Sequence, residues 1–492
     1  MEPRSRLPAQ RLSLANGAAT NPSGDYVLYW MIANRRSGWN WALERAVEWA
    51  RHLGKPLVVL EALRCDYPWA SDRLHAFLLQ GMAGNARAFA ARHVTYLPIV
   101  EGERGAGRGL LAALAARACL VVTDEAPVFF LPRMVAAAAS RLPVRCEKVD
   151  SYGLLPLAAT DAVLPTAYAF RRLLQRLLPR HLETLPRPDP LAGAPLPSLA
   201  ELPPGVAARW PSASPALLAA HATALAPLPI DHTVPMVTDT PGGSEAGAWV
   251  LERFLTQRLA RYAWARNHPD EDAPSGLSPY LHFGHVSVHQ VLEALAGQEG
   301  WSTERLSGKA DGKKAGWWGM SEGAEAFLDE LVTWRELAAN FAAKRDDGEA
   351  YESLPPWARA TLEAHAGDPR PALYTPEQLA AAATHDPLWN AAQRQLLTEG
   401  TIHGYLRMLW GKKILEWSPT PEDALAVMFE LNHRYALDGR DPNSAAGIMW
   451  CLGRYDRPWG PERPVFGTVR YMSSANTRRK LRLTAYLERF GR

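Results

Sequence analysis

The sequence predicts an α/β domain of the doubly wound, Rossmann-like type, followed by an all-α domain. Two observations lead to this prediction. Short apolar runs alternate with segments of helical period over residues 26–150, whereas helical period alone dominates from residue 244 onwards. A stretch rich in proline separates the two patterns, so we expect the boundary between the domains to fall within it.

Composition limits the classes of protein that the chain can represent. With 492 residues it is long enough for two or three domains with large cores. A net charge of +3 means that any nucleic-acid partner would have to meet a local basic face. The four cysteines are too scattered for a zinc site and too few for a disulfide scaffold, which favours packing roles and an intracellular place, in the cytoplasm or nucleoid. No run of 18 apolar residues predicts a membrane span.

The first 24 residues are rich in Arg, Ser and Ala, and we expect a disordered tail, with a transit peptide as the alternative. The α/β domain is expected over residues 25–180. Its predicted strands are residues 26–32, 56–63, 94–100, 119–125 and 144–150. Strands that alternate with helices predict a parallel sheet covered on both faces. Four glycines between Gly102 and Gly109 follow a strand, but their spacing is not that of a dinucleotide-binding loop.

Residues 181–243 are predicted to form the connector. Prolines are spread along this stretch, and they exclude long helices except for brief turns near residues 217–226. Residues 244–492 then form the helical domain, with helical period in residues 245–267 and again in residues 326–341. Residues 297–323 are polar and glycine-rich, which predicts a flexible surface loop. Its lysines and its Trp317–Trp318 pair leave contact with nucleic acid as the alternative.

Residues 386–472 combine aromatic and charged side chains in an unusual way. Trp410 and Trp417 would lie two helical turns apart on one face, although helical spacing of this kind usually marks an ordinary core. The sequence motifs in this stretch are more specific evidence than the spacing of its tryptophans. It contains DPLWNAAQ (386–393), HGYLRMLWGKKILEW (403–417), LDGRDPN (437–443) and ERPVFGTVRYM (462–472).

These motifs, in this order, closely resemble those of the class II cyclobutane pyrimidine dimer photolyases, and the resemblance covers most of residues 25–475. It implies an enzyme that uses light to split pyrimidine dimers in UV-damaged DNA. In such enzymes excited, fully reduced FAD (FADH⁻) passes an electron to a flipped-out dimer, the cyclobutane ring opens, and the electron returns to the flavin. The resemblance also implies an optional deazaflavin antenna (8-HDF) on the α/β domain.

The residues that would bind FAD follow from the same resemblance. LSPYLHFG (277–284) is similar to the segment that binds the flavin phosphates, and residues ahead of a helix suit that role. Arg407 and Asp438 are expected to pair beside the isoalloxazine, where a guanidinium favours the anionic hydroquinone. The cofactor-binding residues implied in this way are Tyr262, Ser275, Gly276, Leu277, Ser278, Arg407, Asp438 and Asn432, the last of these facing flavin N5.

A second group of residues would hold the dimer. Glu330 and Trp334 lie four residues apart, so they share one helical face; the resemblance gives Glu330 a hydrogen bond to the dimer and Trp334 a stacking role. We expect an apolar environment to raise the pKa of Glu330. Trp450 would stack on the second pyrimidine. The remaining substrate-binding residues implied are Arg266, Asn267, Tyr405, Met408 and Arg457, although the loop around Arg457 is shorter than the common family version.

Trp410, Trp389 and Trp417 match the family's electron-transfer chain to oxidised flavin, with Trp389 in the middle and Trp417 exposed at the outer end. The tail from Arg440 is basic, which favours phosphate contacts beside the dimer site. The expected partner is therefore UV-damaged DNA, and we expect a monomer. The alternatives are a cryptochrome-like blue-light receptor, a (6-4) photolyase, which would need a histidine pair over the lesion, and a flavin-free nucleotide-binding protein.

Overall fold

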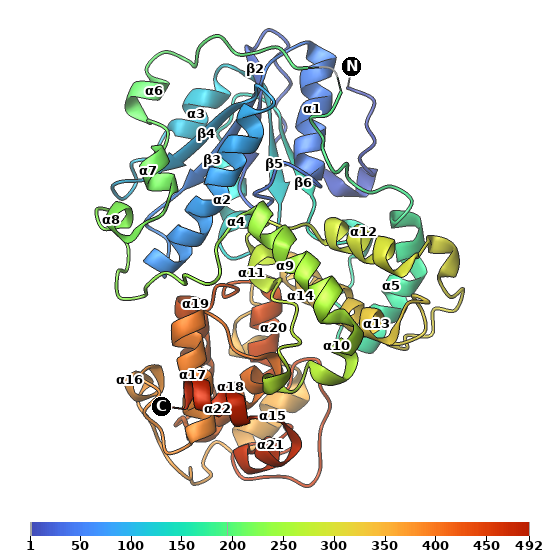
Figure 1. Ribbon diagram of the computed structural model, residues 1–492, viewed down its shortest axis with the longest axis vertical. Coiled ribbons are helices and arrows are strands. Elements are labelled where there is room, and N and C mark those ends of the chain that lie inside the picture. Colours follow the sequence, from blue (N-terminus) through green and yellow to red (C-terminus); the bar gives the residue numbers. More distant parts are fainter. Residues whose placement is uncertain (1, 194, 492) are drawn as a thin grey trace. The chain divides into compact units, whose positions relative to one another are not determined.

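The computed structural model describes residues 2–193 and 195–491 (Figure 1). These residues divide into two compact units. Unit 1 comprises the residues up to Asp161 together with Leu177–Leu251 and Leu277–Thr303. Unit 2 comprises Ala162–Arg176, Glu252–Gly276 and the residues from Glu304 onwards. The whole predicted connector therefore lies in unit 1, and the boundary expected inside it is not where the units divide.

Unit 1 is built on a six-stranded sheet with the strand order β1-β6-β5-β2-β3-β4. Strands β2 to β6 are parallel to their neighbours, and β1 runs antiparallel to β6. Their bounds are β1 Leu12–Leu14, β2 Tyr26–Met31, β3 Leu57–Leu63, β4 Thr95–Val100, β5 Ala118–Glu125 and β6 Cys146–Asp150. The five predicted strands are all present, which confirms the α/β prediction.

Helices cover both faces of this sheet because successive strand residues point to opposite sides. Val27 and Tyr29 of β2 pack in a core that includes α1, whereas Leu28 and Trp30 pack in a second core that includes α3 and α4. The helices of this part of the chain are α1 Trp41–Leu53, α2 Asp72–Ala90, α3 Leu110–Ala115, α4 Leu131–Ala139, α9 Ser244–Gln257, α11 Ser278–His282 and α12 Val288–Glu299, of which α9 runs on into unit 2. The helix α5 (Ala167–His181) also belongs partly to each unit.

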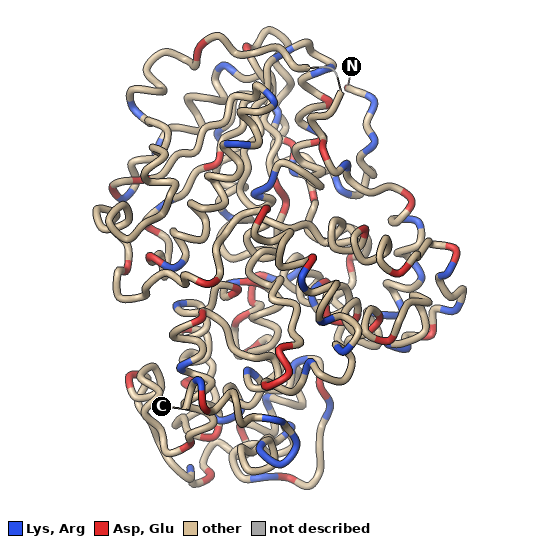
Figure 2. Tube along the Cα trace, viewed as in Figure 1, with Lys and Arg blue, Asp and Glu red and all other residues tan. Residues whose placement is uncertain are grey.

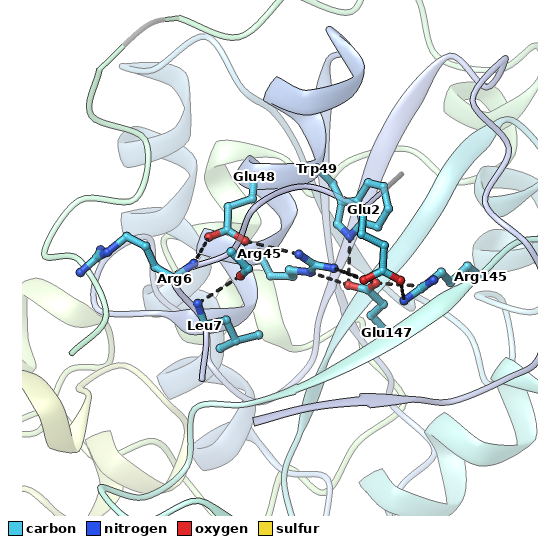
Figure 3. Close-up of polar contacts among 9 residues, drawn as sticks. Glu2, Arg6, Leu7, Arg45, Glu48, Trp49, Arg145 and Glu147 are labelled. Carbon is cyan, nitrogen blue, oxygen red and sulfur yellow. Dashed lines mark hydrogen bonds and ion pairs between the residues drawn. The ribbon is translucent and has the colours of Figure 1, made fainter. Parts of the chain in front are cut away.

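The N-terminal segment is not the expected disordered tail. Leu12–Leu14 forms β1, and residues ahead of it are held by a buried ion-pair cluster (Figure 3). The fully buried carboxylate of Glu147 accepts hydrogen bonds from Arg45 Nε at 2.7 Å and from Trp49 Nε1 at 3.0 Å, and Arg145 Nε lies 2.9 Å away. Arg145 also pairs with Glu2 at 2.6 Å. Charge pairing therefore orders a segment whose composition alone favours disorder.

The proline-rich connector runs along the surface of unit 1 and also packs against the rest of that unit. Its turns are α6 Val206–Arg209, α7 Pro215–Leu218 and α8 Ala222–Leu225, which agrees with the expected brief helices. Leu218 and Leu225 are buried in one apolar cluster with residues of α2, and Trp210 is buried against the sheet. Proline excludes long helices here, but it does not prevent apolar side chains from reaching the core.

Unit 2 is helical around one large core. Its helices are α10 Leu259–Ala265, α13 Glu322–Leu328, α14 Arg335–Lys344, α15 Pro356–Ala364, α16 Pro376–Ala380, α17 Pro387–Glu399, α18 Gly404–Trp417, α19 Pro421–Tyr435, α20 Pro442–Cys451, α21 Ser474–Lys480 and α22 Thr484–Phe490. It also contains the 3₁₀ turns η3 Pro269–Glu271 and η6 Tyr351–Ser353, whereas η1 Ala9–Arg11 and η2 Leu157–Ala159 lie in unit 1 and η4 Thr303–Arg305 lies where the two units meet in the sequence. Its core joins α17, α18, α19 and α20, and Trp389, Trp410 and Trp417 are among its largest fully buried side chains.

The helix predicted over residues 326–341 is interrupted. α13 and α14 are joined by η5 (Asp329–Trp334), which has π-helical geometry. A π-helical turn takes in one more residue than an α-helical turn and is often found at functional sites. Glu330 and Trp334 lie at this interruption, and both are half-buried.

Residues 297–323 differ from the flexible loop that their composition predicts. Trp317 and Trp318 are buried and pack edge to face, with ring centroids 5.0 Å apart. The carboxylate of Glu325 accepts hydrogen bonds from the backbone N–H groups of Gly316 and Gly319. The two indoles are therefore core groups, which argues against the alternative that these rings contact nucleic acid.

Candidate active site

The four helices α17 to α20 of unit 2 carry eight of the predicted site residues, and the sequence defines where two of them start. Asp386 caps α17, its side chain accepting from the N–H groups of Leu388 and Trp389. Asp441 caps α20 in the same way, with Pro442 in the first helical position. Proline suits that position because its missing N–H has no partner there anyway. The motifs DPLW and DPN thus act locally as helix starts.

The predicted ion pair between Arg407 and Asp438 is present. Arg407 Nη2 lies 3.0 Å from Asp438 Oδ1, and both side chains are largely buried. Ser444 extends the cluster, since Asn432 Nδ2 donates to Ser444 Oγ at 2.9 Å and Arg407 Nη1 lies 3.4 Å from the same oxygen. Ser444 was not predicted, because nothing in its spacing indicates that it joins α18 to α19.

Helices α18 and α20 approach each other closely at Gly411. A Cβ atom at this position would lie 2.5 Å from Cys451 Sγ and 3.3 Å from Met428 Sδ. Only glycine therefore permits this separation of the two helices. One turn earlier, Met408 on α18 packs near Gly447 on α20, so the helix that bears Arg407 is fixed against the helix that bears Trp450.

Glu330 lies beside Arg266 and Tyr262. Arg266 Nη1 is 3.3 Å from Glu330 Oε1 and donates to the carbonyl oxygen of Ala326 at 2.9 Å, while its guanidinium carbon lies 5.5 Å from the centre of the Tyr262 ring. Burial of the surrounding region raises the pKa of Glu330, and Arg266 opposes that rise. The predicted direction of the shift is confirmed. The carboxylate nevertheless keeps 44% of its side-chain exposure, so it remains open to a ligand.

Other predicted dimer-binding residues are present at the surface or half-buried. Tyr405 and Met408 are half-buried on α18, and Asn267 is exposed just after α10. Arg457 is exposed, and its guanidinium lies over the ring of Trp459 at 4.4 Å. This stacking gives Arg457 a defined neighbour in the loop whose length departs from the family version.

Trp450 has two cations near its indole. Lys412 Nζ lies 4.9 Å from the ring centre and the Arg470 guanidinium lies 5.4 Å from it. Arg470 also stacks on Trp459 at 3.9 Å and pairs with Asp456 at 2.8 Å. Neither Lys412 nor Arg470 was predicted as a site residue, although cations close to tryptophans in the motifs were a visible signal.

The three tryptophans form a continuous chain in which Trp389 contacts both others. Its ring centre is 6.5 Å from that of Trp410, with nearly parallel planes, and 5.7 Å from that of Trp417. The expected exposure of Trp417 is wrong, because it is only 1% exposed. The rings of Tyr374 and His385 lie 5.4 and 5.3 Å from it, and His385 is exposed. Two further rings therefore separate Trp417 from solvent.

Residues 275–277 precede α11, which begins at Ser278, and the left-handed φ of +73° at Gly276 makes the turn. Ser275 and Gly276 belong to unit 2, as does Tyr262, whereas Leu277 and Ser278 belong to unit 1. Leu277 is buried and Ser278 is exposed. In unit 1 the glycine loop after β4 wraps a carboxylate, because Gly107 N–H donates to Glu101 at 2.9 Å. A negative charge there does not suit a phosphate.

The donor set around Arg407 fits a flavin. The ion pair uses only Nη2 of Arg407, and Asn432 offers an amide that can donate or accept. A buried amide that can donate or accept, in one hydrogen-bond network with a fixed cation, suits a polar, anionic ring system.

Basic side chains gather on α21 of unit 2 (Figure 2). Arg478, Arg479 and Lys480 form its last turn, and all three are exposed. Arg482 follows directly and pairs with Glu271. Within the described part of the chain, no helix has both the length and the apolar character needed to cross a membrane.

Comparisons with known proteins agree with the fold and the site. No family model matches the chain. Deoxyribodipyrimidine photo-lyases are 35% identical in Methanothermobacter thermautotrophicus, over 98% of each chain, and 35% identical in Oryza sativa, over 97% of this chain and 89% of that protein. Crystal structures of an Agrobacterium tumefaciens class III photolyase and a Synechocystis cryptochrome each superpose with a TM-score of 0.67 at 17% and 16% identity, over 96% and 94% of this chain and 88% of theirs.

A mostly parallel α/β unit and a helical unit form the fold that photolyases and cryptochromes share. Sequence identity of 35% to two curated relatives, over nearly the whole chain, narrows this class of proteins to one family. The chain belongs to the deoxyribodipyrimidine photo-lyases, which are light-dependent carbon–carbon lyases of DNA repair.

Proposed function

We propose that the protein is a class II photolyase that repairs cyclobutane pyrimidine dimers in UV-damaged DNA. The observation that carries the proposal is the cluster in which Ser444 joins the Arg407–Asp438 pair to Asn432. It supplies a fixed positive charge and an amide within one buried network. The relatives that cover nearly the whole chain are named deoxyribodipyrimidine photo-lyase, which supports the broader activity.

FAD would be held by Tyr262, Ser275, Gly276, Arg407, Asp438 and Asn432, all of unit 2. When bound and reduced, FAD supplies the photoexcited electron that repair requires. Arg407 would stabilise negative charge on the flavin, with Asp438 fixing the orientation of its guanidinium. Asn432 can either donate or accept through its amide, so it would tolerate both protonation states of the nitrogen that it faces.

The dimer would be held by Glu330, Trp334 and Trp450, with Arg266, Asn267, Tyr405, Met408 and Arg457 around it. Flipping the dimer costs a few kcal/mol, and stacking on indoles returns about 1 to 3 kcal/mol per base. The raised pKa of Glu330 would make its protonated form available as a donor to a pyrimidine carbonyl as negative charge develops there. The weakened bonds of the cyclobutane ring then open.

Electrons would pass from Trp417 through Trp389 to Trp410 and from there to oxidised flavin. Trp410 Nε1 donates to Gln393 Oε1 at 2.9 Å and Trp389 Nε1 donates to the Trp410 carbonyl oxygen at 3.0 Å, so both indoles have acceptors that can stabilise a positive charge. We further propose that unit 2 binds FAD and DNA, that unit 1 is the domain for an optional deazaflavin antenna, and that the enzyme acts as an intracellular monomer.

The test is repair of defined oligonucleotides by the purified, photoreduced protein under blue light and in darkness. One oligonucleotide carries a thymine cyclobutane dimer and another carries a (6-4) photoproduct. We expect light-dependent loss of the cyclobutane dimer alone. Glu330→Ala should lower the yield of repair more than it weakens binding, whereas Glu322→Ala, an exposed carboxylate at the start of α13, is the matched control.

Three results would contradict the proposal in different ways. Loss of the (6-4) photoproduct alone would move the chain to the other lesion class. Flavin absorbance without repair of either lesion would favour a light receptor. If Glu330→Ala and Glu322→Ala had equal effects, the proposed repair activity would stand, but Glu330 would not belong to the site.

A further inference from the structure

Lys412 is a buried cation without a carboxylate partner. Its side chain on α18 is fully buried, and it forms no ion pair within residues 2–193 and 195–491. Its Nζ donates one hydrogen bond, at 2.6 Å, to the carbonyl oxygen of Cys451. The neighbouring Lys413 differs, because it pairs with Glu416 at 2.6 Å. Burial of an unpaired charge costs stability, so such a residue calls for a reason.

The position of the Lys412 ammonium links it to Trp450. Cys451 is the last residue of α20, and carbonyl groups at a helix end lack partners within the helix. A cation there also interacts favourably with the negative end of the helix dipole. The same Nζ lies 4.9 Å from the centre of the Trp450 ring, one residue before Cys451. A single ammonium therefore contacts both the backbone and the aromatic ring at the end of α20.

We propose that Lys412 is a positioning residue that, in its protonated form, fixes Trp450 for stacking on the dimer. This inference rests on the proposed function, since it takes Trp450 as a platform for the lesion. Gly411 brings the two helices close enough for the contact, and the ammonium then fixes the end of α20 and the adjacent indole. Loss of the proton would remove the attraction to the indole and weaken the bond to the carbonyl group.

The charged and titratable groups around Lys412 allow this to be tested by pH. Burial lowers the pKa of Lys412 to about 8, and it raises the pKa of the Cys451 thiol to about 11. Arg470 is the second cation beside the Trp450 ring. Burial raises the pKa of the Asp456 carboxyl, but hydrogen bonds from Arg470, Trp459 and the Arg457 backbone together hold that pKa below its ordinary value. Between pH 7 and 9, Lys412 is therefore the group of this cluster that changes charge.

The experiment measures dark binding of a thymine-dimer oligonucleotide to the flavin-loaded protein from pH 7 to 9, with an undamaged oligonucleotide as reference. We expect the dissociation constant of the wild type to rise about tenfold with a midpoint near 8, as for the removal of one cation–π interaction. Lys412→Met should be about tenfold weaker at pH 7 and flat with pH. Lys412→Arg should also be flat, but with the affinity of the protonated wild type.

Lys413→Met is the matched control, and its pH profile should follow that of the wild type. Unfolding by urea supplies a readout separate from binding. Because an apolar side chain replaces an unpaired buried charge, Lys412→Met should be at least as stable as the wild type at pH 7. A variant that loses stability together with affinity would indicate a merely structural lysine and overturn the proposal.

A wild type that prefers dimer DNA without any pH dependence between 7 and 9 would overturn the role of Lys412 alone. A wild type that does not prefer dimer DNA at any pH would overturn the proposed function, and the inference with it. The reference oligonucleotide separates these two failures.

Discussion

Glu330 shows how a single residue can be both accessible and electrostatically perturbed. Its side chain retains exposure, yet the protein around it raises the pKa of the carboxyl, and Arg266 at 3.3 Å only partly offsets this. A raised pKa in the folded state means that the folded protein binds the proton more tightly than the unfolded chain does. The contribution of Glu330 to stability is therefore largest at low pH and is lost as pH rises through the folded pKa.

Glu330→Gln should remove this dependence, because glutamine does not titrate. We expect the free energy of unfolding of the variant to increase relative to that of the wild type as pH rises from 4.5. At pH 7 the variant should be more stable by less than about 1 kcal/mol, because the carboxylate is partly exposed. Thermal unfolding of both proteins from pH 4.5 to 7.5 measures the difference. A gap that narrows with rising pH would contradict the assigned direction of the pKa shift.

Ser444 illustrates the limit of prediction for single residues. Arg407, Asp438 and Asn432 were identified by resemblance to motifs; the first two pair directly, and Asn432 joins them through Ser444. Ser444 lies in the first turn of α20, where serine usually serves only the helix start. Its bond to Asn432 depends on the relative placement of α19 and α20, and such placement is set by packing rather than by local sequence.

At the scale of elements, the strands and the main helices were predictable because their hydrophobic periods are strong. The π-helical turn at Asp329–Trp334 was not, since its sequence continues an ordinary helical pattern. Composition also misled in two places. The amino-acid composition of residues 2–24 and 297–323 is typical of flexible segments, but Glu147 and Glu325 order them through buried hydrogen bonds and ion pairs.

The spacing of α18 and α20 gives a prediction at this scale. Gly411→Ala adds a methyl group where Cys451 Sγ would be 2.5 Å away, so we expect a loss of about 1 to 3 kcal/mol by overpacking. In the double variant with Cys451→Ala, the smaller side chain makes room, and part of the loss should be recovered. Urea unfolding of the single and double variants measures both values. Strictly additive losses would show that the two residues do not compete for space.

The tryptophan chain gives another prediction at the scale of elements. Trp389→Phe removes the middle ring of three, so light-driven reduction of oxidised flavin should slow by at least tenfold, a change of about 1.4 kcal/mol in activation free energy or more. Repair by protein that is reduced chemically beforehand should remain close to wild type. Flavin absorbance under illumination measures the first rate. Trp301→Phe, a half-buried tryptophan of unit 1, serves as the control, and equal slowing in both variants would remove Trp389 from the chain.

For the molecule as a whole, a net charge of +3 provides little general attraction to DNA, so affinity must come from local clusters. The exposed last turn of α21 is such a cluster. Changing Arg478 and Arg479 together to Ala should lower the slope of log affinity against log salt by about 0.9 for each phosphate that the protein no longer neutralises. Arg489→Ala, on α22 and paired with Glu399, is the control. An unchanged slope in the double variant would exclude α21 from the DNA interface.

The discontinuous make-up of the two units has a consequence for how the chain reaches this structure. Arg171 pairs with Asp329 at 2.9 Å within unit 2, across 158 positions of sequence that include most of the later part of unit 1. During synthesis, the segment Ala162–Arg176 leaves the ribosome long before its partners exist. Contacts between distant segments slow folding. We therefore expect unit 2 to assemble late, after the segment Ala162–Arg176 has already been synthesised. Because both units are discontinuous in sequence, neither can be produced by a single truncation of the chain.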